Sequence, residues 1–296
     1  MVVTIIGSNG FLTKSIASFL NLRNCDIIII GRSKPRTYNY KKFYKIDLSV
    51  DQIPYNDIYK SNIIIYAAGA GIQSNLNESS SLIYELNVLI PVKICKYLNM
   101  LEFKGSFISF GSYFEIGPNK LDHRYDELEL IQSINQINND YCISKRMITR
   151  FISSSNFCFK AWHFILPTIY GENESNHRLI PYVINSIKNK IKLKLTSGTQ
   201  IRQYIYVDEI PKIIFKALNK RIKPGIYNIE GTETFSVKEL VFSLYKLFNK
   251  KLDDKIFGKV SRSDTNMHIL KLNGSKLVKK INFRPSIKIA DVYEKY

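Results

Sequence analysis

The stretch VVTIIGSNGFLTKSIASFL, residues 2–20, decides the fold class of this chain. Its opening apolar run is typical of a buried strand, and apolar side chains then recur at helical spacing, at Phe11, Leu12, Ile16, Phe19 and Leu20. Gly7 and Gly10 lie in the turn between strand and helix. Such a turn can bring a phosphate against bare backbone N–H groups and the positive end of the helix dipole. The stretch therefore predicts a dinucleotide site, with a tight turn that binds nothing as the alternative.

The alternation of strand and helix continues through the first half of the chain. Apolar segments that we interpret as strands lie at residues 25–31, 43–48, 61–69, 105–112 and 157–166. Helices are expected at residues 53–60, at 81–100 and around Tyr141. Strands that are apolar on both faces and alternate with helices form parallel sheets covered on both sides. The sequence thus predicts an α/β fold with a doubly wound, Rossmann-like parallel sheet.

Beyond residue 166 the pattern is less regular. Strands are expected in RQYIYVDEI (202–210) and GIYNIEG (225–231), and Ser236 with Glu239 forms a capping box that opens a helix. We expect a dinucleotide-binding domain with the catalytic residues over 1–166. A smaller, mainly substrate-binding lobe is expected over 167–296, partly interwoven with the first.

Composition and charge limit the classes of function. The 296 residues are 45% hydrophobic, but the longest apolar runs are far shorter than the roughly 20 residues that span a bilayer. Because no signal peptide is recognisable either, we expect a cytoplasmic protein that does not contact membranes. The four cysteines are scattered, which makes disulfides and a metal site unexpected. The net charge of +18 would suit nucleic acid, but the dispersed basic residues favour phosphate-bearing small ligands, so no nucleic-acid partner is expected.

The residues after the second strand indicate which dinucleotide binds. An acidic residue there would bind the ribose 2′-hydroxyl of NAD, whereas this chain has GRSKPR, with Arg32, Ser33, Lys34 and Arg36. Guanidinium groups bind phosphate through paired hydrogen bonds and stack on adenine. The segment favours NADP(H) over NAD(H), with an ordinary basic loop as the alternative.

A second candidate site is NDYCISKRM, residues 139–147. Tyr141 and Lys145 are four residues apart and therefore share one face of the predicted helix. A free tyrosine has a pKa near ~10, so a nearby cation makes its phenolate more accessible at neutral pH. Taken alone, however, such a pair is more often a solvated helix surface than an active site.

In their order along the chain, these segments resemble the extended short-chain dehydrogenase/reductase family of NAD(P)-dependent nucleotide-sugar epimerases, dehydratases and reductases. The resemblance covers nearly the whole chain and rests on GSNGFLT, IDL, AAGAG, LNVLIP, FISFGSYFEIG, YCISK, PTIYGE, IRQYIYVDE and GIYNIEG. It implies an oxidoreductase that acts on a nucleotide-diphosphate sugar, expected as a homodimer. In this context we interpret the Tyr141–Lys145 pair as an active site.

The resemblance also implies roles for individual residues. Tyr141 is expected to be the catalytic acid/base, Lys145 to lower its pKa and hold the nicotinamide ribose, and Ser112 to hydrogen-bond the reacting oxygen. Besides Tyr141 and Lys145, the expected cofactor contacts are Gly7, Asn9, Gly10, Phe11, Leu12, Arg32, Ser33, Asp47, Leu48, Ala67, Ala68 and Gly69. The expected substrate contacts are Tyr113, Phe114, Thr168, Arg178 and Arg202, the last of these on the diphosphate.

Departures from the family's patterns narrow the reaction. Dehydratases of the family usually carry an Asp-Glu pair where this chain has Tyr113 and Phe114. Glu115 follows one place later, and on a strand it would face the other way. Many relatives also have asparagine where this chain has Thr168, which predicts an unusual sugar pocket.

The cofactor segment then separates the remaining reactions. Epimerases of the family usually retain NAD, which fits GRSKPR poorly. The chain looks most like the reductases that complete CDP- and dTDP-linked deoxysugars such as abequose and paratose. We predict NADPH-dependent reduction of a nucleotide-linked 4-keto-6-deoxysugar for surface polysaccharide (O-antigen or capsule) synthesis. The alternatives are an NAD-dependent 4-epimerase and a non-catalytic relative that senses the cofactor or binds RNA.

Asn87 and Pro91 interrupt the helix expected at 81–100. Proline has no N–H and pushes aside the carbonyl four residues earlier, which leaves the Asn87 oxygen free. A simple kink, or a helix that restarts near Pro91, would explain the proline equally well. In the family, the asparagine at this place is linked to the catalytic lysine through a water. We therefore predict that the Asn87 carbonyl holds a water that relays protons to Lys145.

Overall fold

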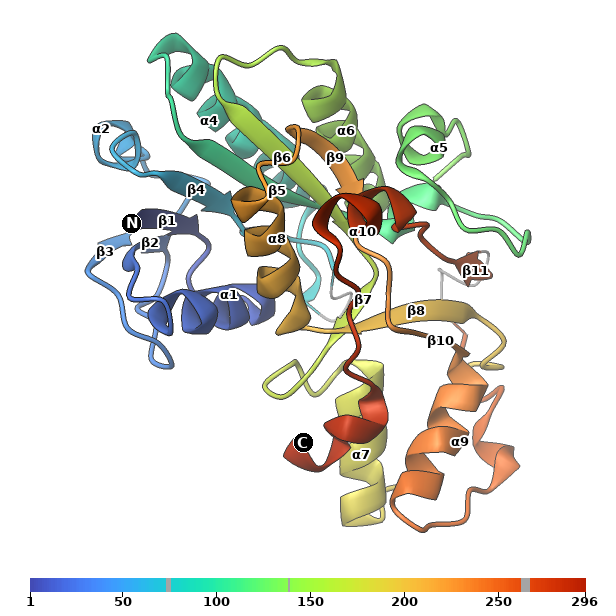
Figure 1. The fold of residues 1–296 in the computed structure, drawn as a ribbon. Helices are drawn as coiled ribbons and strands as arrows, with labels where there is room; N and C mark the ends of the chain where they lie inside the picture. The colour runs from blue at the N-terminus through green and yellow to red at the C-terminus, as the bar shows by residue number, and fades with distance from the viewer. Residues whose placement is uncertain (73–75, 138, 262–266) are drawn as a thin grey trace.

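Seven parallel strands form the central sheet, in the order β3-β2-β1-β4-β5-β6-β9 (Figure 1). The computed structural model describes residues 1–72, 76–137, 139–261 and 267–296. The strands are β1 Val2–Ile6, β2 Asp26–Gly31, β3 Lys42–Lys45, β4 Ile63–Tyr66, β5 Ser106–Ser112, β6 Lys160–Leu166 and β9 Gly225–Asn228. The strand order reverses between β1 and β4, and open parallel sheets bind ligands at such a point, at the carboxyl ends of their strands. The doubly wound fold predicted from the sequence is confirmed.

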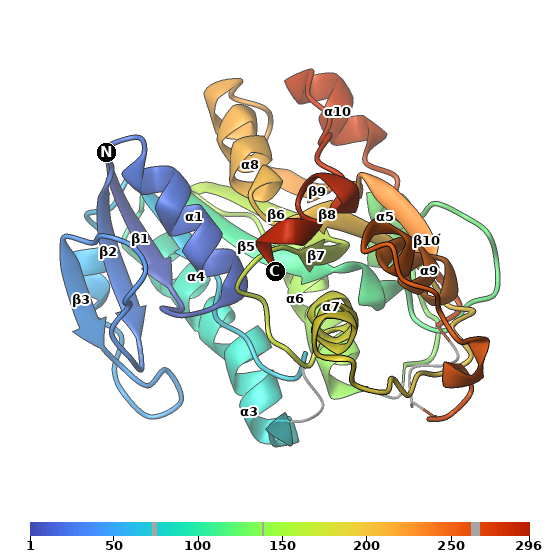
Figure 2. The same ribbon diagram turned by 90° about the horizontal axis from the view of Figure 1, so that it is seen from below.

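Helices cover both faces of this sheet (Figure 2). On one face lie α1 Phe11–Asn21, α8 Glu209–Asn219 and α10 Ser275–Ile281, where Phe19 packs on Phe215 at 5.2 Å between ring centroids. The other face is covered by α2 Tyr55–Ile58, α3 Ser80–Tyr84, α4 Ile90–Met100, α5 Glu127–Gln132 and α6 Asp140–Ser154. Burial of β-branched strand residues on both faces explains the unbroken isoleucine runs of β2 and β4.

The helix expected at residues 81–100 contains a π-helical turn. Between α3 and α4, residues Glu85–Leu89 form the turn η2, in which the Ile90 N–H donates to the Glu85 carbonyl five residues earlier. Pro91 stands in the first turn of α4, where its missing N–H removes a helical hydrogen bond. The wider turn lies against α6.

A second, smaller sheet supports the cavity end of the central one. It consists of β7 Thr168–Tyr170, β8 Ile201–Tyr206, β10 Glu233–Ser236 and β11 Ile269–Leu270. It packs with α7 Leu179–Asn189 and α9 Val237–Leu247 in a third apolar cluster. The predicted capping box is present at the start of α9, because the Glu239 N–H donates to the Ser236 hydroxyl at 3.1 Å and Glu239 accepts from the Ser236 N–H at 2.7 Å. Strand β9, helix α8 and helix α10 return from this half of the chain to the central sheet.

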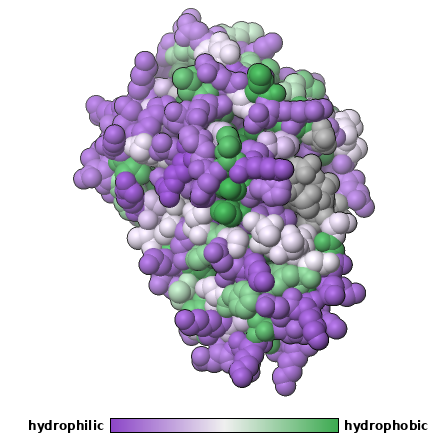
Figure 3. Space-filling model, turned by 90° about the vertical axis from the view of Figure 1, so that its right-hand side faces the viewer, coloured by the Kyte–Doolittle hydropathy of each residue, from purple (hydrophilic) through white to green (hydrophobic). Residues whose placement is uncertain are grey.

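Hydrophilic side chains cover most of the face shown in Figure 3, and the hydrophobic ones form small separate groups. Short 3₁₀ turns complete the structure, η3 Tyr113–Ile116, η4 Asp254–Ile256, η5 Ile289–Asp291 and η6 Tyr293–Lys295. In the described part of the chain, we find no helix with the length and apolar character needed to cross a membrane.

Candidate active site

A cavity of about 580 Å³ opens at the carboxyl ends of the central strands. The structure places all the predicted cofactor residues in its lining: Gly7, Asn9, Gly10, Phe11, Leu12, Arg32, Ser33, Asp47, Leu48, Ala67, Ala68, Gly69, Tyr141 and Lys145. The predicted residues Asn87, Ser112, Tyr113, Phe114, Thr168 and Arg178 line it as well. A fold with the strand order reversed between β1 and β4 therefore brings residues from most of the chain to one cavity.

The glycine turn packs so closely on its neighbours that a side chain at Gly7 or Gly10 would contact them. Gly7 has φ +111°, and a Cβ there would come within 2.8 Å of the Ala68 nitrogen. Thr13, which stands where a third glycine is usual, is fully buried, and its hydroxyl has no hydrogen-bond partner among the described residues. A Cβ at Gly10 would lie 3.3 Å from that hydroxyl, so Thr13 fills the space between turn and helix. The N-terminus of α1 thus stays open to a phosphate.

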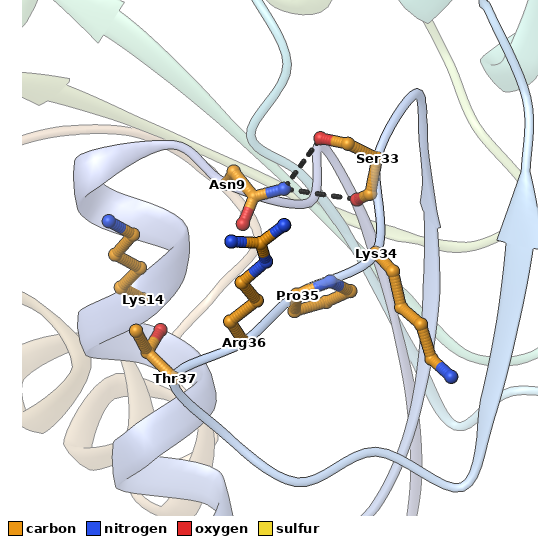
Figure 4. A pocket seen from close by; sticks show the side chains of 7 residues that line it. All are labelled: Asn9, Lys14, Ser33, Lys34, Pro35, Arg36 and Thr37. Atoms are coloured by element: carbon orange, nitrogen blue, oxygen red, sulfur yellow. Dashed lines mark hydrogen bonds between the residues drawn. The ribbon is translucent and has the colours of Figure 1, made fainter.

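A basic basin adjoins the outer end of the cavity, beside β2. It is lined by Asn9, Lys14, Ser33, Lys34, Pro35, Arg36 and Thr37. The Asn9 amide donates to the Ser33 hydroxyl at 2.8 Å and to the Ser33 carbonyl at 3.0 Å, which ties the glycine turn to this loop. The Arg36 guanidinium points toward Asn9, with Lys14 nearby, whereas the Lys34 side chain extends away (Figure 4). The basin therefore joins two cations and several hydroxyl and amide groups.

The cations that line the basin differ from the one predicted to bind a 2′-phosphate, Arg32. Arg32 lines the large cavity and lies near Asp47, whose pKa is held below its ordinary value first by the Ser49 hydroxyl and also by Arg32. Arg36 and Lys14 lie in the basin instead. Lys14 was missed by the sequence analysis, although a lysine in the first turn of the helix after the glycine turn was a usable signal.

Tyr141 and Lys145 lie on the first turns of α6, which Asn139 caps by accepting from the Cys142 N–H at 3.2 Å. The Lys145 ammonium lies 5.9 Å from the centroid of the Tyr141 ring and donates to the Phe110 carbonyl at 3.0 Å. Burial lowers the pKa of Lys145 to about 8. Tyr141 therefore faces a cation that loses its proton not far above neutral pH.

Burial raises the pKa of Tyr141 above its ordinary value, while a hydrogen bond with Ser112 and the charge of Arg178 oppose the rise. The cation that opposes the rise here is Arg178, so the expected lowering of this pKa by Lys145 stays a prediction. Lys145 is itself desolvated and donates a hydrogen bond to the Phe110 carbonyl. Tyr141 is consequently protonated at neutral pH and suited to donate a proton.

Ser112 ends β5, and the chain then turns into the 3₁₀ helix η3 rather than continuing as a strand. Glu115 is fully buried, accepts from the Ser112 N–H at 2.8 Å and is not part of the cavity lining. The prediction that Glu115 lies on a strand is therefore wrong, because the chain forms a 3₁₀ turn at this point. Glu115 still does not replace the acid and base of the dehydratases, since its carboxyl is turned into the protein.

Asn87 lies in the π turn and uses its side chain to join two parts of the site. Its amide oxygen accepts from the Ala70 N–H at 3.0 Å, and its amide nitrogen donates to the Ala70 carbonyl and to the Ser144 hydroxyl, both at 2.9 Å. This fixes the loop after β4 against α6. The water relay from the Asn87 carbonyl stays a prediction, which the ordered waters of a crystal structure with cofactor would test.

At the substrate end of the cavity, Tyr113, Phe114 and Thr168 are uncharged, and Arg178 supplies a cation. The hydroxyls of Tyr113 and Thr168 lie 2.5 Å apart, so the two residues that depart from the family's pattern bind each other. The Phe114 ring meets the Tyr141 ring edge-on at 6.5 Å between centroids. Arg178 forms an ion pair with Glu174 at 3.1 Å and donates to the Ile169 carbonyl at 2.9 Å.

Arg202 lies elsewhere than expected for a residue that grips the substrate diphosphate. It is 6% exposed, donates to the Ile201 and His268 carbonyls, and its guanidinium carbon lies 5.8 Å from the Phe114 ring centroid. It is not part of the cavity lining.

A metal site is not apparent, since the described residues include no group of three or more His, Cys, Asp and Glu side chains that could hold an ion.

The chain is similar to several known proteins. Residues 3–229 match the model of the NAD dependent epimerase/dehydratase family. A CDP-abequose synthase from Salmonella muenchen is 28% identical over 191 residues, which are 61% of this chain and 58% of that protein. A CDP-abequose synthase from Salmonella typhimurium is 22% identical over 96% of this chain and 93% of its own length. In overall fold, the chain is similar to a dTDP-glucose 4,6-dehydratase from Streptomyces venezuelae solved with NAD bound, with a TM-score of 0.82, 16% identity and coverage of 100% of this chain and 97% of the other.

Proposed function

Since the chain belongs to the NAD dependent epimerase/dehydratase family, we propose that it reduces the C4 ketone of a nucleotide-linked 4-keto-6-deoxysugar with NADPH. The observation that carries the proposal is a complete Ser112, Tyr141 and Lys145 set beside Tyr113 and Phe114, which carry no carboxylate at the positions where dehydratases of the family have Asp and Glu. Elimination of water from a sugar needs an additional acid and base, and Tyr113 and Phe114 supply neither. The Tyr113 hydroxyl is in addition held by Thr168.

The cofactor preference is supported by the basic basin. Arg36 and Lys14 offer two cations beside the ribose end of the cavity, where a 2′-phosphate would add about two negative charges. Gly7 and the open end of α1 would hold the pyrophosphate. NADPH bound in this cavity would supply the hydride. Because NADPH is consumed in a reduction rather than regenerated, this preference fits a reductase better than an epimerase.

The residues around the ketone perform the rest of the reaction. As the hydride adds to C4, the carbonyl oxygen becomes an alkoxide, and Tyr141 donates its proton to that oxygen. Ser112, which hydrogen-bonds Tyr141, is placed to hold the same oxygen. The Lys145 ammonium stabilises the resulting tyrosinate until solvent returns a proton to it. Oxygen and carbon each gain one bond to hydrogen, so the product is the 4-hydroxy sugar.

The substrate class rests on the curated relatives. The two relatives described above are CDP-abequose synthases, which supports a nucleotide-linked deoxysugar as substrate. Use of the product in surface polysaccharide is part of the same proposal. Arg178 lines the cavity, and its charge acts on Tyr141, so it is the residue that we propose binds the substrate's phosphates. A cytoplasmic location is a further part of the proposal.

A homodimer forms part of the same proposal. Leu89 in the π turn and Met147 on α6 are 47% and 46% exposed, and the two elements lie side by side. Two apolar side chains on adjoining helices suit an interface with a second copy of the chain. Light scattering of the wild type should give twice the chain mass, and Leu89→Glu should give the mass of one chain.

Transfer of deuterium tests the reaction itself. With NADPH deuterated at the transferred position and a CDP-4-keto-6-deoxysugar, one deuterium should appear at C4 of the product for each NADPH oxidised. An NAD-dependent 4-epimerase would instead interconvert the C4 epimers of a sugar without net oxidation of cofactor. Recovery of epimers with no deuterium at C4 would therefore contradict the proposed reduction.

A further inference from the structure

Glu115 is a fully buried carboxyl directly behind the active site, and the reaction described above does not use it. Its Oε1 accepts from the Ser112 N–H at 2.8 Å, while its Oε2 is buried and makes no hydrogen bond of ordinary geometry among the described residues. The Thr149 hydroxyl lies close enough to lower the pKa of this carboxyl, but less than burial raises it. A capping box alone does not require such burial. Glu239 makes the same bond to the Ser236 N–H on the exposed surface of α9. The desolvation of Glu115 therefore calls for another role.

Polar and charged groups surround this carboxyl on all the elements that pack against it. A Cβ at Gly111 would come within 2.6 Å of both Glu115 Oε1 and His163 Nε2, so the carboxyl and the imidazole share the space that the glycine leaves. His163 hydrogen-bonds Ser109 at 2.8 Å and Thr149 at 3.0 Å. Burial lowers the pKa of His163 to about 3, so this residue adds no charge at neutral pH.

The cations near Glu115 both come from α6. Arg146 spends its Nε and one terminal nitrogen on the main-chain carbonyl of Glu115, at 3.2 and 2.5 Å. Lys145 donates to the Phe110 carbonyl at 3.0 Å, one residue before the Gly111 against which the carboxyl lies. The Glu115 carboxyl and the Lys145 ammonium therefore contact neighbouring residues of β5, Gly111 and Phe110. Tyr141, also on α6, completes the set of titratable groups that sense the charge of Glu115.

The pKa values of Glu115 and Lys145 indicate how the carboxyl acts on the ammonium. Burial raises the pKa of Glu115 to about 7, although the bond from the Ser112 N–H opposes the rise. Lys145 has its pKa lowered to about 8 by burial, and the Glu115 charge opposes that change. Around pH 8, where Lys145 loses its proton, Glu115 is therefore mostly ionised. The negative charge is present where it keeps the ammonium protonated.

The geometry points to Glu115 as a positioning residue that holds Lys145 in its ammonium form while Tyr141 donates its proton. It acts through Lys145 and does not touch substrate. The role rests on the proposed reduction, because only then must Lys145 stabilise a tyrosinate at each turnover. Through the bond to the Ser112 N–H, the same carboxyl also fixes the end of β5 that carries the Ser112 hydroxyl.

Glu115→Gln separates charge from shape, because glutamine keeps the acceptor for the Ser112 N–H and loses the charge. We expect the alkaline loss of kcat/KM to move about one pH unit lower in this variant, with kcat/KM at pH 6.5 within about threefold of wild type. Glu239→Gln removes the same charge from an exposed capping box and should leave the profile unchanged. A Glu115→Gln profile that superimposes on the wild-type profile would reduce Glu115 to a helix cap and overturn the inference.

A second measurement does not depend on the enzyme's activity. Competitive labelling of lysines with acetic anhydride, followed by mass spectrometry across pH, reports the titration of Lys145 in the folded protein. Its midpoint should be about one pH unit lower in Glu115→Gln than in wild type. A shifted midpoint in a protein that reduces no 4-keto sugar would separate failure of the proposed function from failure of this inference. An unshifted midpoint would overturn the inference whatever the activity.

Glu115→Asp covers the case in which the glutamine variant does not fold. The aspartate keeps the charge but is too short to reach the Ser112 N–H in the same way. If charge is what matters, the folded aspartate variant keeps the alkaline limb and the Lys145 midpoint of wild type. If the alkaline limb of kcat/KM in Glu115→Asp moved as far as we expect for Glu115→Gln, only the bond to the Ser112 N–H would matter. That result would overturn the inference.

Discussion

Arg36→Ala tests whether the basic basin selects the phosphorylated dinucleotide. In the structure the Arg36 guanidinium points toward Asn9 at the rim of the glycine turn, with Lys14 on the next helix beside it (Figure 4). The alanine variant removes one cation and its hydrogen-bond donors from the basin. It leaves the large cavity intact, because Arg36 is not part of that lining.

The expected loss follows from the bond that is removed. A hydrogen bond between a guanidinium and a phosphate contributes about 1.5–3 kcal/mol, which corresponds to roughly 10- to 150-fold in Kd. Because Arg36 is exposed, solvent screening places the expected loss at the lower end, about 10- to 30-fold for NADPH. NADH carries no 2′-phosphate, so its Kd should change by less than about twofold.

Titration calorimetry with NADPH and NADH measures both constants on each variant. Arg32→Ala belongs in the same series, since the sequence predicted that Arg32 grips the 2′-phosphate and the structure places it in the neighbouring cavity near Asp47. If Arg32 does so, its variant loses about 1.5–3 kcal/mol for NADPH and almost nothing for NADH. Lys34→Ala is the matched control, because Lys34 also lines the basin but its side chain extends away from Asn9 and Arg36 (Figure 4). Equal losses for NADPH and NADH in Arg36→Ala would refute the assignment of the basin.

Three further outcomes follow from the site. Tyr141→Phe removes the proton donor and almost no volume, so turnover should fall by about 10²–10⁴-fold while NADPH affinity stays nearly the same; a variant that keeps more than about a tenth of wild-type turnover would exclude Tyr141 as the essential acid. The Tyr296 hydroxyl donates to Glu174 at 2.7 Å, and Glu174 pairs with Arg178, so Tyr296→Phe should raise KM for the sugar nucleotide a few-fold and leave the Kd of NADPH unchanged; a changed NADPH Kd would contradict this coupling. His163 is buried with its pKa lowered to about 3, so unfolded chains take up its proton near pH 6.5 while folded ones do not, and stability should fall by at most about 1.4 kcal/mol per pH unit as pH drops from 6.5 toward 3. Denaturant unfolding should show a shallower acid loss for His163→Gln, and equal slopes would exclude His163 as the source.

Much of this arrangement could be predicted because local patterns encode it. Gly7 and Gly10 stand between an apolar run and a helical period, and the isoleucine-rich segments could form little but buried parallel strands. The cavity position of residues after those strands followed from the fold, since parallel strands end at one edge. Tyr141 and Lys145 share a helix face by spacing alone.

Contacts between distant segments could not be predicted in the same way. Lys14 and Arg36 meet only because α1 and the loop after β2 turn toward each other, and Glu174 is 122 residues from Tyr296. The direction of a side chain at a strand end was equally hidden. Ser112 is followed by a 3₁₀ turn, which sends Glu115 into the core instead of across a strand face. Arg202 likewise lies in β8 with its guanidinium behind Phe114.

The measurement that tests the central claim most directly is NADPH oxidation against a panel of CDP-, dTDP-, UDP- and GDP-linked 4-keto-6-deoxysugars. The account predicts that absorbance of NADPH falls with at least one member of the panel, in step with formation of the 4-hydroxy sugar. It also predicts that NADH is a poorer reductant and that Tyr141→Phe abolishes the reaction. No oxidation with any of the four nucleotides, together with C4 epimerisation or loss of water from a nucleotide sugar in the presence of NAD, would contradict it.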